Sequence, residues 1–182
     1  VLHPQTEKMA HHWHKLRVEE LLFESGLPWT ILQPAAYLQN ILTGWTAILA
    51  EGVYRVPYPV ETRLGMVDLD DVAEVAATVL TEPGHAGAIY ELAGAELFSQ
   101  SEVAAVIAEI LSQPVQAEEI PLDKWAKHAR LSGVGEYQVE TLLKMFQYYA
   151  QYGFWGNPHT LNWLLGRPPT GLRTFVARVH ST

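Results

Sequence analysis

The chain has 182 residues, of which 48% are hydrophobic and 18% charged, and its formal net charge is −8. This composition is typical of a globular protein with one or two small domains. The acidic balance argues against a nucleic-acid partner, since affinity for a phosphate backbone depends on Lys and Arg. The sequence has no cysteine, which excludes disulfides and favours a cytoplasmic location, and no apolar run is long enough to span a bilayer, so no membrane partner is expected.

A helix and a strand are predicted near the start of the chain, after a loop over residues 1–10. Val18, Leu21 and Leu22 recur at helical spacing, and Gly26 is placed to end the helix. Residues 29–32 are then a short apolar run of strand-forming residues. Such a run between two helices predicts a parallel strand covered on both faces.

The residues that follow this strand, 33–37, are at the position where open α/β sheets bind ligands, beyond the carboxyl end of a strand. A second helix is predicted over 37–49. Its first turn offers free N–H groups and a partial positive charge, which suit a carboxamide or an anionic substrate group near Tyr37 and Asn40. The alternative is that Tyr37 only covers the end of the core.

His11 and Lys15 are four residues apart, so they share a face of the first helix. An ammonium group there can hold a ribose hydroxyl or stabilise a developing oxyanion. The alternative is a solvated Lys15 paired with Glu19. His11, His12 and His14 also form a cluster, but this spacing does not place three imidazoles on one helical face. A surface histidine cluster is therefore favoured, and no metal site is predicted.

The middle of the chain contains an extended segment followed by an acidic run. Residues 52–65 are expected to be an extended segment and a loop, with a flap over the site as one interpretation. Asp68, Asp70 and Asp71 then precede an apolar helical face. Acids at a helix start satisfy its free N–H groups, so we expect Asp70 to cap this helix and favour capping over a divalent-cation site.

Further strands are predicted over 88–92 and 115–120, and Ser99 with Glu102 forms a capping box at the start of the helix between them. Four more helices are expected, at 122–131, 137–151, 160–165 and 170–180. Aromatic residues of this part would bias a cleft toward an apolar or planar substrate, although most are expected to be packing: Trp125, Phe146, Tyr148, Tyr149, Tyr152, Phe154 and Trp155.

Three stretches of the sequence carry a resemblance to a known family. The first has His11 and Lys15, a VEE helix and SGLPWTILQP followed by a Tyr and an Asn; the others are MVDLDDVAEVAATVLTEPGHAGAIYELAG and LLGRPPTGLRTFVARV. With them the chain resembles the NmrA-like family of the atypical short-chain dehydrogenase/reductase superfamily. The family's Gly-rich turn, which holds the dinucleotide pyrophosphate, has no counterpart here. The resemblance therefore implies that the chain starts at about the fifth strand of the family's domain.

The resemblance implies an α/β fold, with part of a Rossmann-like parallel sheet and its helices over residues 1–95. A small, mostly helical substrate lobe over residues 96–182 is expected to be interleaved with it. The Tyr-x-x-x-Lys pair of short-chain reductases is absent, since no Tyr precedes Tyr37. The resemblance implies two catalytic candidates, Lys15 and Tyr37. It also implies a set that binds the nicotinamide end of NADP or NAD: His11, Lys15, Pro34, Ala35, Ala36, Tyr37 and Asn40.

Three functions stay open for the sequence. The first is an NAD(P)-dependent oxidoreductase, or a truncated form of one, that reduces a quinone, an aldehyde or a similar small apolar carbonyl. The second is a non-catalytic NAD(P)-sensing regulator that acts through a protein partner. The third and weaker is a truncated fold with hydrolytic chemistry, although no Gly-x-Ser-x-Gly elbow occurs. Because a strand such as 29–32 normally has neighbours on both sides, we also expect either homo-oligomers that form through an open sheet edge or a missing partner segment that covers it.

Overall fold

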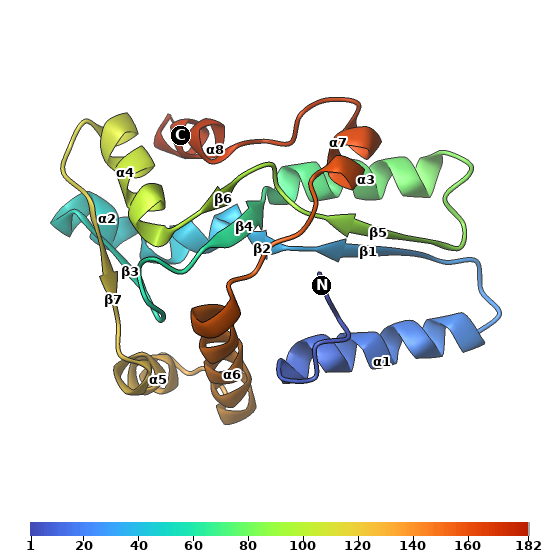
Figure 1. Ribbon diagram of the computed structural model, residues 1–182, viewed down its shortest axis with the longest axis horizontal. Helices are drawn as coiled ribbons and strands as arrows, with labels where there is room; N and C mark the ends of the chain where they lie inside the picture. The colour runs from blue at the N-terminus through green and yellow to red at the C-terminus, as the bar shows by residue number, and fades with distance from the viewer. Residues whose placement is uncertain (182) are drawn as a thin grey trace.

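The computed structural model describes residues 1–181, so Thr182, the last residue of the predicted 96–182 lobe, lies outside the described residues. Short strands form the centre of the molecule and helices surround them (Figure 1). The elements in chain order are α1 (Ala10–Glu24), β1 (Thr30–Pro34), β2 (Ala36–Tyr37), the 3-10 helix η1 (Leu38–Gly44), α2 (Trp45–Glu51), β3 (Val53–Val56), β4 (Leu64–Val67), α3 (Leu69–Thr81), β5 (Ala88–Leu92), β6 (Leu97–Phe98), α4 (Gln100–Leu111), β7 (Gln116–Glu119), α5 (Leu122–Leu131), α6 (Glu136–Tyr152), α7 (His159–Leu165) and α8 (Leu172–His180).

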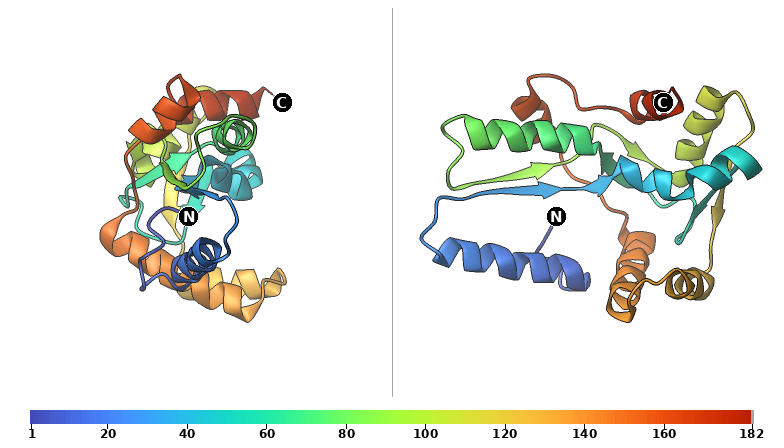
Figure 2. Two further views of the ribbon diagram at one scale, coloured as in Figure 1. Left: turned by 90° about the vertical axis from the view of Figure 1, so that its right-hand side faces the viewer. Right: turned by 180° about the vertical axis from the view of Figure 1, so that it is seen from behind.

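Parallel pairing dominates the strands, as predicted for an α/β fold. β1 pairs with β5 in parallel, and Gln33 lies opposite Glu91. β2 pairs with β4 and β3 with β7, also in parallel, whereas β6 pairs with β4 in the antiparallel direction. Helices α1 and α3 lie on opposite sides of the β1–β5 pair in every view (Figures 1 and 2). The mixed α/β fold with a partly parallel sheet is therefore confirmed.

The strand predicted over 29–32 is confirmed as β1, but it continues through Gln33 and Pro34. Those two residues therefore belong to the strand and not to the loop after it. The single helix predicted over 37–49 is wrong, because this segment is divided into η1 and α2. The division falls at Gly44, whose backbone, at φ −105° and ψ 7°, is not helical.

Helix α1 is confirmed, and Gly26 beyond its end has a φ of +73° that favours glycine. Its inward face is nevertheless not the apolar one, since the side chains of Val18 and Leu21 are 58% and 68% exposed. His12 and Glu19 are buried instead. The buried Glu19 carboxylate accepts hydrogen bonds from the side-chain amide of Gln33 at 2.9 and 3.1 Å, which offsets the cost of its desolvation.

The N-cap of helix α3 lies two residues before the predicted one. Asp68, and not the predicted Asp70, is the N-cap residue, and its side chain accepts a hydrogen bond from the Asp70 backbone N–H at 3.2 Å. The backbone of Asp68 is extended, as an N-cap requires. The capping box of Ser99 and Glu102 at the start of α4 is confirmed in both directions.

Residues 52–65 contain the expected extended segment, which is strand β3. Tyr54 on β3 is 6% exposed, and its hydroxyl donates a hydrogen bond to Gln100 Oε1 at 3.0 Å. Tyr58 packs against the rings of Phe146 and Tyr149 at centroid distances of 6.0 and 6.3 Å. These side chains are therefore part of the packed interior, and the flap over the site stays a prediction.

The second half of the chain returns to both sides of the first half. α5 and α6 lie on the same side as α1, whereas α7 and α8 pack against α3 and α4 on the other side (Figure 2). The division into a 1–95 domain and a 96–182 lobe stays a prediction. None of the helices in the described part of the chain has the length and apolar character needed to cross a membrane.

Candidate functional site

The carboxyl ends of β1 and β5 lie side by side and gather three loops. Leu2 donates its backbone N–H to the carbonyl oxygen of Pro34 at 2.8 Å, and Ala35 donates to the carbonyl of Leu92 at 2.9 Å. The start of the chain, the segment after β1 and the segment after β5 therefore meet at one point. This edge of a parallel sheet is where ligands bind in open α/β folds.

Helix α1 brings its predicted residues toward the same edge. The helix runs back along β1 in the opposite direction (Figure 1), and the Glu19–Gln33 hydrogen bonds fix the two elements. Lys15 and His11 are one and two turns before Glu19, which places them about 6 and 12 Å further along the helix axis toward the carboxyl end of β1. His11, Lys15 and Glu19 share one helix face.

The His11 imidazole is kept neutral in this position. Burial, and to a smaller extent the positive charge of Lys15, lowers the pKa of His11. Its Nδ1 atom is buried and has no hydrogen-bond partner among the residues described. A neutral ring nitrogen without a partner, beside an ammonium group, suits a ligand that carries hydroxyl or amide groups.

The other two histidines of the cluster have different surroundings. His12 is buried with its ring edge-to-face on Phe154 at 5.4 Å, and burial, followed by the neighbouring His11, lowers its pKa to about 4. His14 Nδ1 instead forms a hydrogen bond of 2.7 Å with the hydroxyl of Tyr137 on α6. The three imidazoles are therefore divided between different environments, and no group of three potential metal ligands lies together within residues 1–181.

A cavity of about 330 Å³ lies at the carboxyl end of β5, between that strand and the end of α6. Its polar lining comes from His3, Glu91 and Asn157, and its aromatic lining comes from Tyr148, Tyr152, Phe154 and Trp155. Four of the seven aromatics that the sequence analysis singled out thus line a cavity. The remaining three (Trp125, Phe146 and Tyr149) make ring contacts within the packing of the α5–α6 side.

The segment after α6 forms the floor of this cavity and depends on a small residue. A Cβ atom on Gly156 would lie 2.9 Å from a methyl carbon of Leu2 and 3.1 Å from the Cβ of Ala93. Glycine therefore lets the segment lie directly against the ends of the strands. A second cavity, of about 370 Å³, lies on the other side of residues 155–157 and is lined by the segment after β5 and by Pro158 and His159.

The structure gathers the predicted residues only partly. Pro34, Ala35, Ala36 and Tyr37 follow one another at the end of β1, and Asn40 is exposed on η1. Lys15 is exposed on α1 and shares no hydrogen bond with Tyr37 within residues 1–181. The catalytic roles of Lys15 and Tyr37 stay predictions, as does the cofactor set.

Sequence reasoning missed His3 and Glu91, which line the cavity at the carboxyl end of β5. Glu91 carried a usable signal, because it is next to the last residue of a predicted parallel strand and the rule applied to residues 33–37 holds for that strand too. His3 carried none. Its backbone has a φ of +52°, which is uncommon for a non-glycine residue and is not visible in the sequence.

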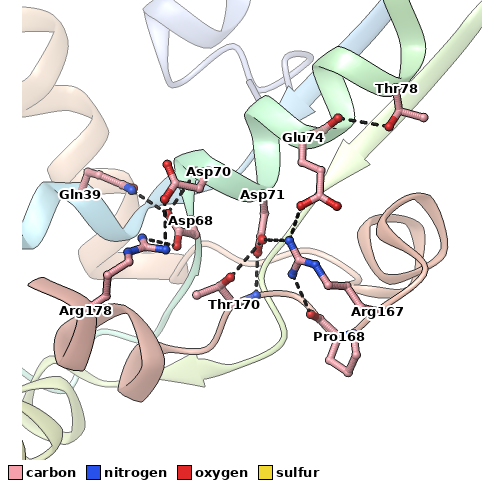
Figure 3. Close-up of polar contacts among 10 residues, drawn as sticks. All are labelled: Gln39, Asp68, Asp70, Asp71, Glu74, Thr78, Arg167, Pro168, Thr170 and Arg178. Atoms are coloured by element: carbon pink, nitrogen blue, oxygen red, sulfur yellow. Dashed lines mark hydrogen bonds and ion pairs between the residues drawn. The ribbon is translucent and has the colours of Figure 1, made fainter. Parts of the chain in front are cut away.

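The acidic run before and within α3 is neutralised by arginines from the end of the chain (Figure 3). Asp68 is 0% exposed and pairs with Arg178 at 2.6 Å, and Asp71 is 1% exposed and pairs with Arg167 at 2.8 Å. The carboxylates are thus paired with guanidinium groups, and the interpretation of this run as a helix start with structural acids agrees with these contacts.

Comparison with known proteins finds a matching family and relatives that are similar in sequence. The NmrA-like family matches residues 2–175. The NAD(P)H azoreductase of Xenophilus azovorans is 30% identical over 160 residues, covering 87% of this chain and 54% of that protein. Quinone oxidoreductase 2 of Escherichia coli is 25% identical over 181 residues, covering 100% of this chain and 63% of that protein. The chain therefore spans only about half to two thirds of the length of these two relatives.

Solved structures agree with the sequence comparison. The crystal structure of an NADPH-dependent quinone oxidoreductase from Escherichia coli in complex with NADPH has a TM-score of 0.85 and 25% identity, and the match covers 99% of this chain and 63% of that one. A triphenylmethane reductase from Citrobacter sp. has a TM-score of 0.77 at 22% identity, covering 92% of this chain and 58% of that one. At 22% identity, the likeness to the triphenylmethane reductase shows a shared fold.

Proposed function

The chain belongs to the NmrA-like family, and from this premise we propose that it is part of an NAD(P)-dependent oxidoreductase. In this proposal α1 and the segment after β1 hold the nicotinamide half of the cofactor. The aromatic cavity beside them holds the substrate. The two relatives named above, an NAD(P)H azoreductase and a quinone oxidoreductase, support this function.

One observation carries the proposal, namely that the nucleotide candidates and the cavity share the same end of the β1–β5 pair. The Leu2–His3 segment connects them, because Leu2 is hydrogen-bonded to Pro34 and His3 lines the cavity. A ligand bound against residues 34–37 would therefore lie next to a molecule held among Tyr148, Phe154 and Trp155. Hydride transfer requires this proximity of two reactants.

The residues present fit the nicotinamide half of the cofactor. The unpaired His11 Nδ1 and the ammonium group of Lys15 offer polar partners to ribose hydroxyls. NAD(P)H, when bound, supplies a hydride that with one proton converts a quinone to a hydroquinone and leaves the oxidised nicotinamide. Lys15 is proposed to stabilise negative charge on the substrate oxygen.

The cavity favours a planar, apolar carbonyl compound as substrate. Four aromatic side chains provide stacking surface, and His3 and Asn157 provide hydrogen-bonding groups at the wall. A volume of about 330 Å³ is at the small end of ligand pockets, which suits a one- or two-ring molecule such as a quinone.

A non-catalytic NAD(P)-sensing role through a protein partner is the second candidate. His11 occupies the position four residues before Lys15, where short-chain reductases have their tyrosine. A sensor would bind the nucleotide without reducing a quinone or an aldehyde. The third candidate, hydrolysis, receives no support from the contacts of the site.

The experiment that tests the proposal is calorimetric titration of NADPH and NADH into the purified chain and into Lys15→Ala. Loss of the ammonium group is expected to weaken binding by about tenfold, because a hydrogen bond to a charged group is worth roughly that factor. The matched control is Lys127→Ala, at an exposed lysine of α5. Unchanged affinity in Lys15→Ala would remove Lys15 from the site, and binding without turnover of quinones would favour the sensor.

We also propose that the chain self-associates. Within residues 1–181, β1 pairs with β5 alone, and α1 exposes Val18 and Leu21. Open strand edges and exposed apolar side chains are both features that monomers usually protect. Light scattering at micromolar concentration is expected to give a mass above 20.4 kDa, and a monomer would contradict this proposal. The cytoplasmic location stays a prediction.

A further inference from the structure

The fully buried carboxylate of Asp68 joins two parts of the chain that are far apart in sequence. Its Oδ1 accepts a hydrogen bond from Gln39 Nε2 at 2.7 Å, and its Oδ2 accepts one from Arg178 Nη2 at 2.6 Å. Figure 3 shows both side chains pointing toward Asp68, one from η1 and the other from α8. The N-cap of α3 is therefore also a bridge between η1 and α8.

Gln39 is held at both ends of its side-chain amide. Besides donating to Asp68, it accepts a hydrogen bond through Oε1 from the backbone N–H of Leu69 at 3.1 Å. The side chain thus cannot turn without losing two contacts. Gln39 stands between Tyr37 and Asn40, two residues of the proposed nicotinamide site.

Helix η1 needs such external contacts more than an α-helix does. It is a 3-10 helix of seven residues, whereas runs of this type longer than three or four residues are uncommon because their hydrogen bonds are poorly aligned. Its N-cap residue, Tyr37, makes no side-chain capping bond. The contacts of Gln39 with the start of α3 supply the anchor that η1 lacks at this end.

The anchor depends on the position of the Asp68 carboxylate, and α8 holds that carboxylate through Arg178. A buried carboxylate without a cation is strongly destabilising. Arg178 provides the cation through Nη2 and pairs through Nη1 with Asp70 at 3.0 Å. Loss of Arg178 would therefore leave the Asp68 carboxylate without this cation and would destabilise the position of the acceptor to which Gln39 is bonded.

We propose that Asp68 is a positioning residue that, with Arg178 as its countercharge, fixes Tyr37 and Asn40 through Gln39. The proposal rests on the proposed function, since it assigns this geometry to the nicotinamide site. Asp68 itself touches neither substrate nor cofactor in this account. Its effect on binding passes through the conformation of η1.

The first test needs no cofactor. Gln39→Leu removes both amide contacts, and Arg178→Gln removes the countercharge. Amide hydrogen exchange of residues 38–44 is expected to become about tenfold faster in both variants, while exchange of β1 and β5 is unchanged. Arg178→Lys is expected to restore part of the protection. The matched control is Arg173→Gln on the same helix, since Arg173 pairs with the exposed Glu109.

Wild-type exchange rates over 38–44 in Gln39→Leu would overturn the proposal. Equal acceleration in all elements would also overturn it, because it would mean general destabilisation instead of a local anchor.

The second readout is affinity for reduced nicotinamide mononucleotide, which is expected to fall by about tenfold in Gln39→Leu. Unchanged affinity in a variant whose η1 has loosened would refute the positioning role. Failure of the wild-type chain to bind this probe would count against the proposed function, and the exchange data would still decide whether Asp68 anchors η1.

Discussion

Replacing Asp71 by alanine should be among the most damaging changes at the α3–α7 side of the molecule. The carboxylate is 1% exposed and accepts hydrogen bonds from Arg167 Nη2 at 2.8 Å and from Thr170, through N at 2.6 Å and through Oγ1 at 3.0 Å (Figure 3). Asp71→Ala removes all of them. The loop that leads to α8 then loses its attachment to α3 at Thr170 and keeps the pair of Arg167 with Glu74.

The size of the effect follows from what each partner retains. Breaking a buried ion pair costs about 3 to 5 kcal/mol when the remaining charge stays buried. The Arg167 side chain is 42% exposed and keeps its pair with Glu74, so most of that penalty is relieved. The substitution also removes the two hydrogen bonds from Thr170 to the charged carboxylate, and the loss of each costs about 1.5 kcal/mol. We therefore expect Asp71→Ala to lower the free energy of unfolding by about 3 kcal/mol.

Urea denaturation followed by circular dichroism measures this loss. The matched control is Glu74→Ala, which removes the exposed partner of the same arginine and is expected to cost less than about 0.5 kcal/mol. Both variants should keep the wild-type denaturant slope. A loss below about 1 kcal/mol in Asp71→Ala, or equal losses in the two variants, would refute the reasoning.

Three further changes test the packing, the capping and the titration inferred here. A Cβ atom on Gly94 would lie 1.8 Å from the carbonyl oxygen of Met66, so Gly94→Ala is expected to lower the free energy of unfolding by about 3 kcal/mol or more, and wild-type stability in urea would contradict the packing described. Ser99→Ala removes one side of the α4 capping box and should lower the free energy of unfolding by about 1 kcal/mol in the same assay. A urea midpoint equal to that of the wild type would contradict this expectation. The pKa of His12 is lowered in the folded state, so the unfolded chain binds its proton more readily and stability should fall as the pH drops from about 6.5 to about 4, by up to about 3 kcal/mol. His12→Gln should remove this component and His128→Gln, at an exposed position, should not; a pH dependence equal in all three proteins would show that His12 is not its source.

Local signals in the sequence predicted much of the fold. The strand predicted over 88–92 has the same two ends as β5, and the capping box of Ser99 and Glu102 is present. Both features depend on residues that are close together in the chain. The boundary at Gly44 was missed because a continuous apolar stripe, including Ile41 and Ile48, favours one helix across it. The spacing of apolar residues does not reveal that the backbone of one residue, Gly44, leaves the helical region.

The contacts that were not predictable are the long-range ones. Arg178 lies 110 residues beyond Asp68, and nothing near either residue indicates their pairing. The burial of Glu19 likewise depends on an amide from β1, so a charged residue occupies the inner face of α1 while Val18 is exposed. The site residues at the end of β1 could be predicted from a general rule for parallel sheets. The cavity could not, because its lining combines residues from β5 with residues from the end of α6.

The most direct test of the central claim is an NMR titration of the isotope-labelled chain with reduced nicotinamide mononucleotide and, separately, with adenosine 5′-monophosphate. Chemical-shift changes report even weak binding residue by residue. We expect the nicotinamide probe to shift the signals of His11, Lys15, Tyr37 and Asn40, and the adenosine probe to leave them unchanged. No shift at these four residues, or the same shifts with both probes, would contradict the assignment of this end of the sheet to the nicotinamide half of the cofactor.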